Sequence, residues 1–210
     1  MEEDNHPGIK AIIFDLGNVL IDFDHMIAAQ RLSKLTDKTG KEIFDLFFNS
    51  ELTGLFEEGK ISPLDFFLKV KETLNLKMGF AEFVPIWNEI FFCTKKNLDV
   101  YNLACNLKKT YKLALLSNIN TLHFEYIKKT FPLLDAFHNV IASFQLGLRK
   151  PQRRIYQKTL NILHVLPEEV FYVDDREELV ESAKELKIRA HVFTGLEKLK
   201  KDLLDAGINC

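Results

Sequence analysis

Polar residues capable of chemistry follow apolar runs at three points of the chain. Each run has the length of a buried strand. The polar residue that follows it lies where a parallel strand reaches the carboxyl edge of an α/β sheet, the edge that binds ligands. The residues that follow the runs are Asp15, Ser117, Asn118, Asp174 and Asp175, and Lys150 lies in a loop between the second and third of these points. One fold would gather a carboxylate nucleophile, a hydroxyl, a cation and an acidic pair in one place.

Each of these residues also has a purely structural explanation. Ser117 and Asn118 are residue types that cap the N-termini of helices. An acidic pair such as Asp174-Asp175 can do the same beside a helix dipole, and a lysine before a proline is common in surface loops. Their combination at one sheet edge is what favours a shared site.

The elements that position these residues can be read from hydrophobic spacing. Five short apolar runs are typical of buried strands: 9–14, 112–116, 139–143, 170–173 and 189–193. Segments with helical spacing lie between the later runs, as in Val100, Leu103, Ala104 and Leu107. Strands that alternate with such helices predict an α/β fold with a Rossmann-like parallel sheet and helices on both faces.

The alternation is interrupted between about 25 and 92, where no convincing strand is found. Helical patterns cover 26–35, 41–48 and 63–74, and phenylalanines crowd the segment: Phe44, Phe47, Phe48, Phe56, Phe66 and Phe67. We expect an inserted all-helical cap at 25–92 over a catalytic core formed by 1–24 and 93–210. Packing inside the cap explains most of these aromatic side chains, and one or two of them can face the site.

Composition excludes several classes of function. The 210 residues are 47% hydrophobic and 28% charged, with a net charge of −2, which gives no basic field for nucleic acid. The opening residues 1–8 lack the basic and apolar regions of a signal peptide, and nothing predicts a membrane segment, so we expect a cytoplasmic protein. Cys93, Cys105 and Cys210 lie far apart without metal-ligand spacing, which favours reduced thiols.

The motifs taken together resemble those of the haloacid dehalogenase superfamily. The resemblance rests on DLGNV at 15–19, Ser117-Asn118, Lys150-Pro151 and Asp174-Asp175 in this order, and it covers roughly residues 9–193. It implies that the insert is a helical cap of the C1 type. The stretches FDLGNVL, SNINTLH and LGLRKPQRRIY are similar to the bacterial sugar-phosphate phosphatase branch, which includes α-glucose-1-phosphate phosphatases and is related to the amino-terminal phosphatase domain of epoxide hydrolases.

This resemblance implies a phosphatase that works through an aspartyl-phosphate formed on Asp15. A phosphate dianion repels a carboxylate nucleophile, so the attack requires cations, and Mg²⁺ prefers carboxylate, carbonyl and water oxygens. The family pattern assigns one oxygen of Asp15, the carbonyl of Gly17 and a carboxylate oxygen of Asp175 as metal ligands. Asp174 would act through water or by orienting its neighbours.

The remaining motif residues would bind the substrate phosphate. Lys150 supplies a fixed positive charge in the family, and Ser117 donates a hydrogen bond to a phosphoryl oxygen. Backbone N–H groups near Gly17, Asn18 and Asn118 do the same as negative charge shifts onto those oxygens.

Gly17 departs from most phosphatases of the superfamily, which carry there a second aspartate that acts as general acid and base. Loss of such an acid costs about 10²–10⁴-fold in rate. Three explanations are open: substrates with good leaving groups, a proton lent by Asp22, Asp24 or His25, or the loss of efficient turnover. The similar phosphatase branch also carries glycine at this position.

Two further departures concern loops beside the motifs. Leu179 stands where the family has an Asp or Asn that contacts the metal site from behind. Gln152 and Arg153 replace the usual Asp-Pro after Lys150-Pro151. Such changes can tune the site without removing its chemistry.

The favoured function is Mg²⁺-dependent hydrolysis of a small phosphorylated metabolite, foremost a sugar phosphate. The first alternative is a weakly active or non-catalytic binding or regulatory protein on the same scaffold. The second is a 2-haloacid dehalogenase, which is disfavoured because Asp174-Asp175 would repel each other without a cation. We expect a monomer or a weak homodimer, because cap phenylalanines would either pack internally or form a dimer contact.

Overall fold

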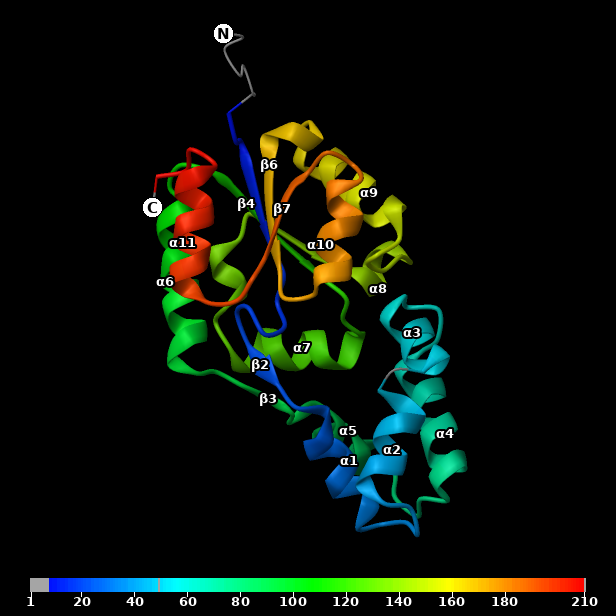
Figure 1. Cartoon of the computed structure of the whole chain (residues 1–210). Coiled ribbons are helices and arrows are strands. Elements are labelled where there is room, and N and C mark those ends of the chain that lie inside the picture. Colours follow the sequence, from blue (N-terminus) through cyan, green and yellow to red (C-terminus); the bar gives the residue numbers. More distant parts are fainter. Residues whose placement is uncertain (1–7, 49, 210) are drawn as a thin grey trace, which may run out of the picture.

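A parallel sheet forms the centre of the protein. The computed structural model describes residues 8–48 and 50–209 (Figure 1). Within these ranges, five strands pair in the order β5-β4-β1-β6-β7. They are β1 (Ala11–Phe14), β4 (Lys112–Ser117), β5 (Asn139–Ala142), β6 (Val170–Asp174) and β7 (Arg189–Val192). Every run predicted as a strand forms one, with ends shifted by one or two residues, so the predicted α/β class is confirmed.

Helices cover both faces of the sheet, because side chains of β1 alternate between two hydrophobic clusters. Ile12 and Phe14 point to one cluster, and Ala11 and Ile13 point to the other. The first face carries α6 (Lys95–Leu107), α7 (Thr121–Thr130) and α11 (Leu196–Asp205). The second carries α9 (Arg153–Leu163) and α10 (Glu177–Lys184). The shorter elements are α8 (Ser143–Leu146) and two 3₁₀ turns, Leu134–Ala136 and Pro167–Glu169.

The insert after β1 has a hydrophobic core of its own. Its helices, called the cap below, are α1 (His25–Ser33), α2 (Gly40–Phe47), α3 (Glu51–Glu57), α4 (Pro63–Leu74) and α5 (Phe80–Asn88). Trp87 is completely buried among them, and the rings of Phe56 and Phe66 stack with centroids 4.5 Å apart. Five of the six phenylalanines singled out in the sequence are buried, and Phe44 is half-buried. Internal packing of the cap therefore accounts for most of them, and Phe44 and Phe48 also line the cavity described below.

The prediction of no strand between 25 and 92 was wrong at its end. β3 (Phe91–Phe92) pairs antiparallel with β2 (Asp22–Phe23), so that the two chain crossings between core and cap run side by side. Strands of two residues are too short to show alternation, which is why the sequence does not reveal them. The division into 1–24 with 93–210 and 25–92 stays a prediction, and both of its boundaries fall next to this ladder.

The structure also bears on the terminal and membrane predictions. In the described ranges, none of the helices combines the length and apolar character that a bilayer span requires. Cys93 and Cys105 are free thiols. Cys210 and the opening residues 1–7 lie outside the part of the chain that the structure describes.

Candidate active site

The turn after β1 places the first motif at the carboxyl edge of the sheet. Asp15 follows the four buried residues of β1, and its N–H donates to the carbonyl of Val173 on β6 at 2.9 Å. The chain then reverses through Asn18, which adopts a left-handed conformation with φ of 55° and donates its N–H to the carbonyl of Ile21 at 2.7 Å. Asparagine tolerates this conformation better than most residues. Its side chain thereby faces the same edge as Asp15.

Lys150 joins the first and last motifs. Its Nζ lies 2.7 Å from Oδ1 of Asp15, 2.6 Å from Oδ2 of Asp174 and 3.1 Å from the carbonyl oxygen of Leu116. Burial alone would lower the pKa of Lys150, but the two carboxylates hold it above its ordinary value. The lysine therefore stays charged. Asn118 fixes its backbone, because the Asn118 amide donates to the carbonyl of Lys150 and accepts from its N–H, both at 2.8 Å.

Asp174 is completely buried beneath the site, and both of its oxygens have partners. Oδ2 accepts from Lys150 and from the hydroxyl of Tyr172, and Oδ1 accepts from the N–H of Arg176 at 3.0 Å. Burial pushes the pKa of Asp174 upward, but the charge and hydrogen bonds of Lys150 hold it below its ordinary value. Asp174 is thus placed to hold and orient the lysine.

The three aspartates form an oxygen-donor set suited to a hard cation. Asp15, Asp174 and Asp175 each offer an oxygen within 4.8 Å of the others, and Asn18 donates to Oδ2 of Asp175 at 2.8 Å. Burial, together with the charges of Asp174 and Asp175, raises the pKa of Asp15 to about 7 despite the nearby lysine. Three carboxylates around one lysine leave an excess of negative charge that a divalent cation with oxygen ligands would neutralise. The residues fit Mg²⁺.

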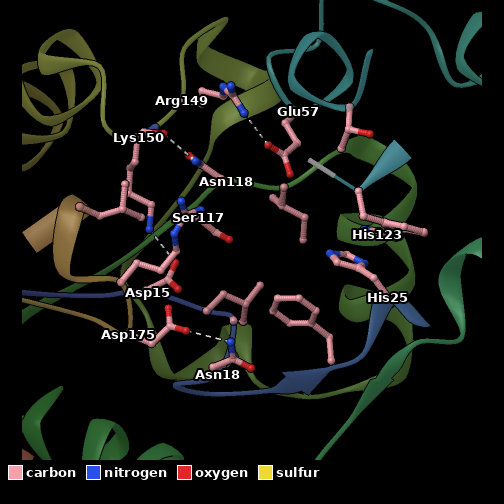
Figure 2. A pocket seen from close by; sticks show the side chains of 18 of the residues that line it. Asp15, Asn18, His25, Glu57, Ser117, Asn118, His123, Arg149, Lys150 and Asp175 are labelled. Atoms are coloured by element: carbon pink, nitrogen blue, oxygen red, sulfur yellow. Dashed lines mark hydrogen bonds and ion pairs between the residues drawn. The ribbon is translucent and has the colours of Figure 1, made fainter. Parts of the chain in front are cut away.

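A cavity of about 420 Å³ separates this sheet edge from the cap. The predicted site residues line it together, namely Asp15, Gly17, Asn18, Ser117, Asn118, Lys150 and Asp175. Asp174 is the exception, since it lies beneath the lining and contacts the cavity through Lys150. Figure 2 shows Asp15, Ser117 and Lys150 at the sheet side of the cavity, with His25 and Glu57 on its cap side.

The cap and the strands that join it to the core contribute two kinds of wall. The expectation that one or two cap phenylalanines face the site is confirmed by Phe44 and Phe48, whereas the polar wall was not expected. The first is aromatic and consists of Phe23, His25, Phe44, Phe48 and Phe91, with His123 from α7. The second is polar and consists of Ser50, Thr53, Gly54 and Glu57. The spacing of the polar set places it on one face of α3, and this helical stripe was the available signal. The neighbouring phenylalanines obscured it.

The structure gives a steric reason for glycine at position 17. A Cβ atom at Gly17 would lie 2.7 Å from Cε1 of Phe23, closer than real Cβ contacts. The ring of Phe23 on β2 therefore fills the space in which a side chain at position 17 would begin. No other residue fits there without movement of the ring.

The three proton donors considered in the sequence have different positions. Asp22 lies outside the cavity lining and accepts from Lys96 Nζ at 2.7 Å and Asn97 Nδ2 at 3.0 Å. Asp24 caps α1 by accepting from the N–H of Met26. His25 lines the cavity between the rings of Phe23 and Phe48, and burial lowers its pKa to about 4. At neutral pH it is uncharged and is a poor acid.

The other departures from the family pattern also have structural partners. Gln152 Nε2 donates to Oε1 of Glu58 at 2.6 Å and so ties the loop after Lys150 to the cap. Leu179 is buried at the cavity lining, and its carbonyl accepts from the hydroxyl of Tyr156 at 2.9 Å. Leu179 offers no side-chain polar contact to the acidic pair, and Asn18 donates to Asp175 from the first motif. Arg153 begins α9.

Comparison with known proteins identifies the class. The family model of haloacid dehalogenase-like hydrolases matches residues 9–187, and the chain therefore belongs to that family. The predicted superfamily and its hydrolase class are confirmed.

Curated relatives of similar length are phosphatases. The chain is 29% identical to D-ribitol-5-phosphate phosphatase of Bacteroides thetaiotaomicron over 184 residues, which cover 85% of this chain and 88% of that protein. It is 28% identical to glyceraldehyde 3-phosphate phosphatase of Pyrococcus furiosus over 176 residues, covering 80% of this chain and 73% of that protein.

Solved structures agree with this placement. A family enzyme of Bacteroides thetaiotaomicron, crystallised with magnesium and inorganic phosphate, superposes with a TM-score of 0.78 at 27% identity, covering 88% of this chain and 94% of that one. L-2-haloacid dehalogenase of Xanthobacter autotrophicus superposes with a TM-score of 0.63 at 20% identity, covering 96% and 85% of the two chains, and shares the fold.

Proposed function

We propose that this protein is a Mg²⁺-dependent phosphatase that hydrolyses a small phosphorylated metabolite, foremost a sugar phosphate, through an aspartyl-phosphate on Asp15. The observation that carries the proposal is the placement of Lys150 between Asp15 and Asp174 at the base of a cavity that Asp175 also lines. This arrangement offers a nucleophile, a fixed cation and further carboxylates for a metal. The phosphatase activities of the two curated relatives support it.

The residues of the chain have distinct tasks in this reaction. Asp15 attacks phosphorus with one carboxylate oxygen, and Lys150 keeps a positive charge beside both the nucleophile and the phosphoryl oxygens. Ser117 donates its hydroxyl to a phosphoryl oxygen, as do backbone N–H groups near Asn18 and Asn118. Asp174 holds Lys150 in place.

The metal would be held by Asp15, the carbonyl of Gly17 and Asp175. When bound, Mg²⁺ supplies the positive charge that lets a phosphate dianion approach a carboxylate. Asn18 orients Asp175 for this task through the 2.8 Å hydrogen bond to Oδ2.

Dehalogenation is the less suitable chemistry for this site. A haloacid substrate brings one negative charge and needs no metal, whereas the site gathers the carboxylates of Asp15, Asp174 and Asp175 around a single lysine. Without a cation this excess charge would oppose an anionic substrate. A non-catalytic role would give no chemical reason for the buried Lys150 to lie between Asp15 and Asp174 at the base of the cavity.

Phosphate release tests the proposal. Wild type and Asp15→Asn are compared on p-nitrophenyl phosphate, α-glucose 1-phosphate and ribitol 5-phosphate, each with Mg²⁺ and with EDTA. We expect release by the wild type with Mg²⁺ and none by Asp15→Asn or in EDTA. A folded wild type that binds Mg²⁺ but releases phosphate from none of the three would contradict the proposal in favour of a binding protein.

A further inference from the structure

We propose that Glu57 of the cap donates the proton to the leaving oxygen of the substrate and so performs the task for which Gly17 has no side chain. This inference rests on the proposed phosphatase function. It adds a catalytic residue from an element that carries none of the four motifs.

The position of Glu57 matches the stereochemistry of phosphoryl transfer. Glu57 belongs to the polar stripe of α3 that lines the cavity, and Figure 2 shows it on the opposite side of the cavity from Asp15. In an in-line displacement, the leaving oxygen lies on the side of phosphorus away from the nucleophile. A proton donor across the cavity from Asp15 therefore faces the atom that needs the proton.

The contacts of Glu57 leave its carboxyl group available. Among the described residues, its one polar partner is Nη1 of Arg149, 3.5 Å from Oε2, which is a long contact. Its neighbour Glu58 is fully engaged by Lys60 at 2.5 Å and Gln152 at 2.6 Å and does not line the cavity. Two adjacent carboxylates thus have different tasks, one holding the cap to the core and one facing the substrate.

The backbone of Glu57 is fixed with respect to the core. Its carbonyl accepts from the hydroxyl of Ser143 at 2.6 Å. A Cβ atom at Gly54, one turn earlier on α3, would lie 3.1 Å from Cζ of Arg149, so glycine there lets the guanidinium pack closely against the helix. An acid must be held within hydrogen-bond reach of the proton acceptor, and these contacts restrict the position of α3.

Burial and the neighbouring charges act in opposite directions on the pKa of Glu57. The charged groups that face Glu57 are Arg149 and Lys150 from the loop before α9 and Arg176 from the start of α10. Burial raises the pKa of Glu57, and the three cations oppose this only in part. The direction of the shift is the one that a general acid working near neutral pH requires.

The proton and bond changes balance in two steps. In the first, a bond forms between Asp15 and phosphorus, the bond from phosphorus to the leaving oxygen breaks with its electron pair, and that oxygen takes the proton of Glu57. In the second, water attacks phosphorus and gives a proton to Glu57, while the bond to Asp15 breaks and restores its carboxylate. Phosphate and an alcohol leave, and Glu57 is again protonated.

The test uses leaving groups of different quality. We expect Glu57→Gln to lower kcat on ribitol 5-phosphate, an alkyl phosphate with a poor leaving group, by about 10²–10⁴-fold. The same variant should lose much less on p-nitrophenyl phosphate, whose leaving group departs without a proton. Glu57→Asp keeps a carboxyl group and should recover part of the rate on ribitol 5-phosphate.

Glu58→Gln is the matched control, since it removes a neighbouring carboxylate that holds the cap but does not face the cavity. It should affect both substrates equally. Equal losses for Glu57→Gln on both substrates, or a change in KM alone, would overturn the inference and leave Glu57 as a binding or positioning residue. So would a wild type that cleaves p-nitrophenyl phosphate but no alkyl phosphate. Absence of any Asp15-dependent release overturns the proposed function itself, and the two failures are thereby distinguished.

Discussion

At the scale of single residues, the packing of Gly17 against Phe23 explains a departure from the family pattern. The space for a side chain at 17 is occupied by the ring that β2 delivers. Glycine at position 17 is therefore coupled to phenylalanine at position 23, and the two residues have to be considered together.

Restoring the aspartate should fail when only one residue is changed. We expect Gly17→Asp to lower the free energy of unfolding by about 1–3 kcal/mol, because the added side chain forces the Phe23 ring out of place. The double variant Gly17→Asp, Phe23→Ala should lose less than the two single variants together. Urea unfolding of all four proteins measures this coupling. Additive losses would show that the ring and the side chain do not compete.

The two acids of the last motif should respond differently to neutralisation. Asp174→Asn removes a completely buried partner of Lys150, and we expect a loss of about 3–5 kcal/mol in the free energy of unfolding without divalent cation. Asp175 lines the cavity, so Asp175→Asn should lower the free energy of unfolding far less. It should instead raise the Mg²⁺ concentration needed for half-maximal phosphate release. Urea unfolding and a Mg²⁺ titration test the pair, and the reverse pattern would exchange the roles given to the two residues.

The part of the candidate site that could be predicted from the sequence consists of residues at or next to the ends of strands. Asp15, Ser117 and Asp174 are brought together because strand ends in a parallel sheet meet at one edge, and an apolar run reveals where a strand ends. Phe23 and Glu57 could not be found in this way. Their positions depend on how the cap packs on the core, and hydrophobic spacing within the cap does not contain that information.

At the scale of elements, α7 and α5 are joined through a buried histidine. His123 on α7 stacks on Trp87 with ring centroids 5.7 Å apart, and its Nε2 lies 3.1 Å from the carbonyl oxygen of Trp87. Asn120 contacts the other ring nitrogen at 3.0 Å. Burial and the nearby His25 lower the pKa of His123 to about 3. The folded protein thus favours the neutral imidazole at this contact between core and cap.

Acid should therefore weaken this contact in a defined window. Between about pH 6.5 and pH 3 the unfolded chain binds a proton at His123 that the folded chain does not, so stability falls as the pH is lowered through this range. The contribution of this fully buried group is at most about 1.4 kcal/mol per pH unit. We expect His123→Gln to show a shallower decline in the free energy of unfolding between pH 6.5 and 4.5 than the wild type, measured by urea unfolding. An unchanged slope would exclude His123 as the titrating group.

Elements with clear periodicity were predicted well, and elements fixed by tertiary contacts were not. The five strands of the sheet and the helices at 25–33, 40–47 and 63–74 follow from spacing. β2 and β3 exist because Asp22 and Phe23 meet Phe92 and Phe91 across a separation of about seventy residues in the chain. No local pattern of two residues can indicate such a pairing.

At the scale of the whole molecule, the site links the stability of core and cap to ligand binding. We expect Mg²⁺ with inorganic phosphate to raise the free energy of unfolding by about 2.7 kcal/mol at a hundredfold excess over the dissociation constant. Phosphate alone should have little effect, because Asp15 and Asp175 repel it without a cation. Thermal unfolding with each addition, and with Asp175→Asn as control, tests this expectation. An equal stabilisation by phosphate without metal would contradict the role given to the aspartates.

The oligomeric state stays a prediction of monomer or weak homodimer. The buried cap phenylalanines remove one reason to expect a dimer contact. Sedimentation equilibrium at several protein concentrations measures the state directly.

The pairing of β2 with β3 has a consequence for how this protein family can change over evolution. Residues paired across an antiparallel ladder have Cα atoms about 4.5–5.5 Å apart. The chain therefore enters the cap and returns from it at nearly one point. A segment whose two ends are this close can be exchanged for another of different length without moving β1 or β4. We therefore expect a chimaera that carries a relative's segment between Phe23 and Phe91 to keep the core fold and the placement of Asp15, Lys150 and Asp175, while losing Glu57 and acquiring new substrate selectivity.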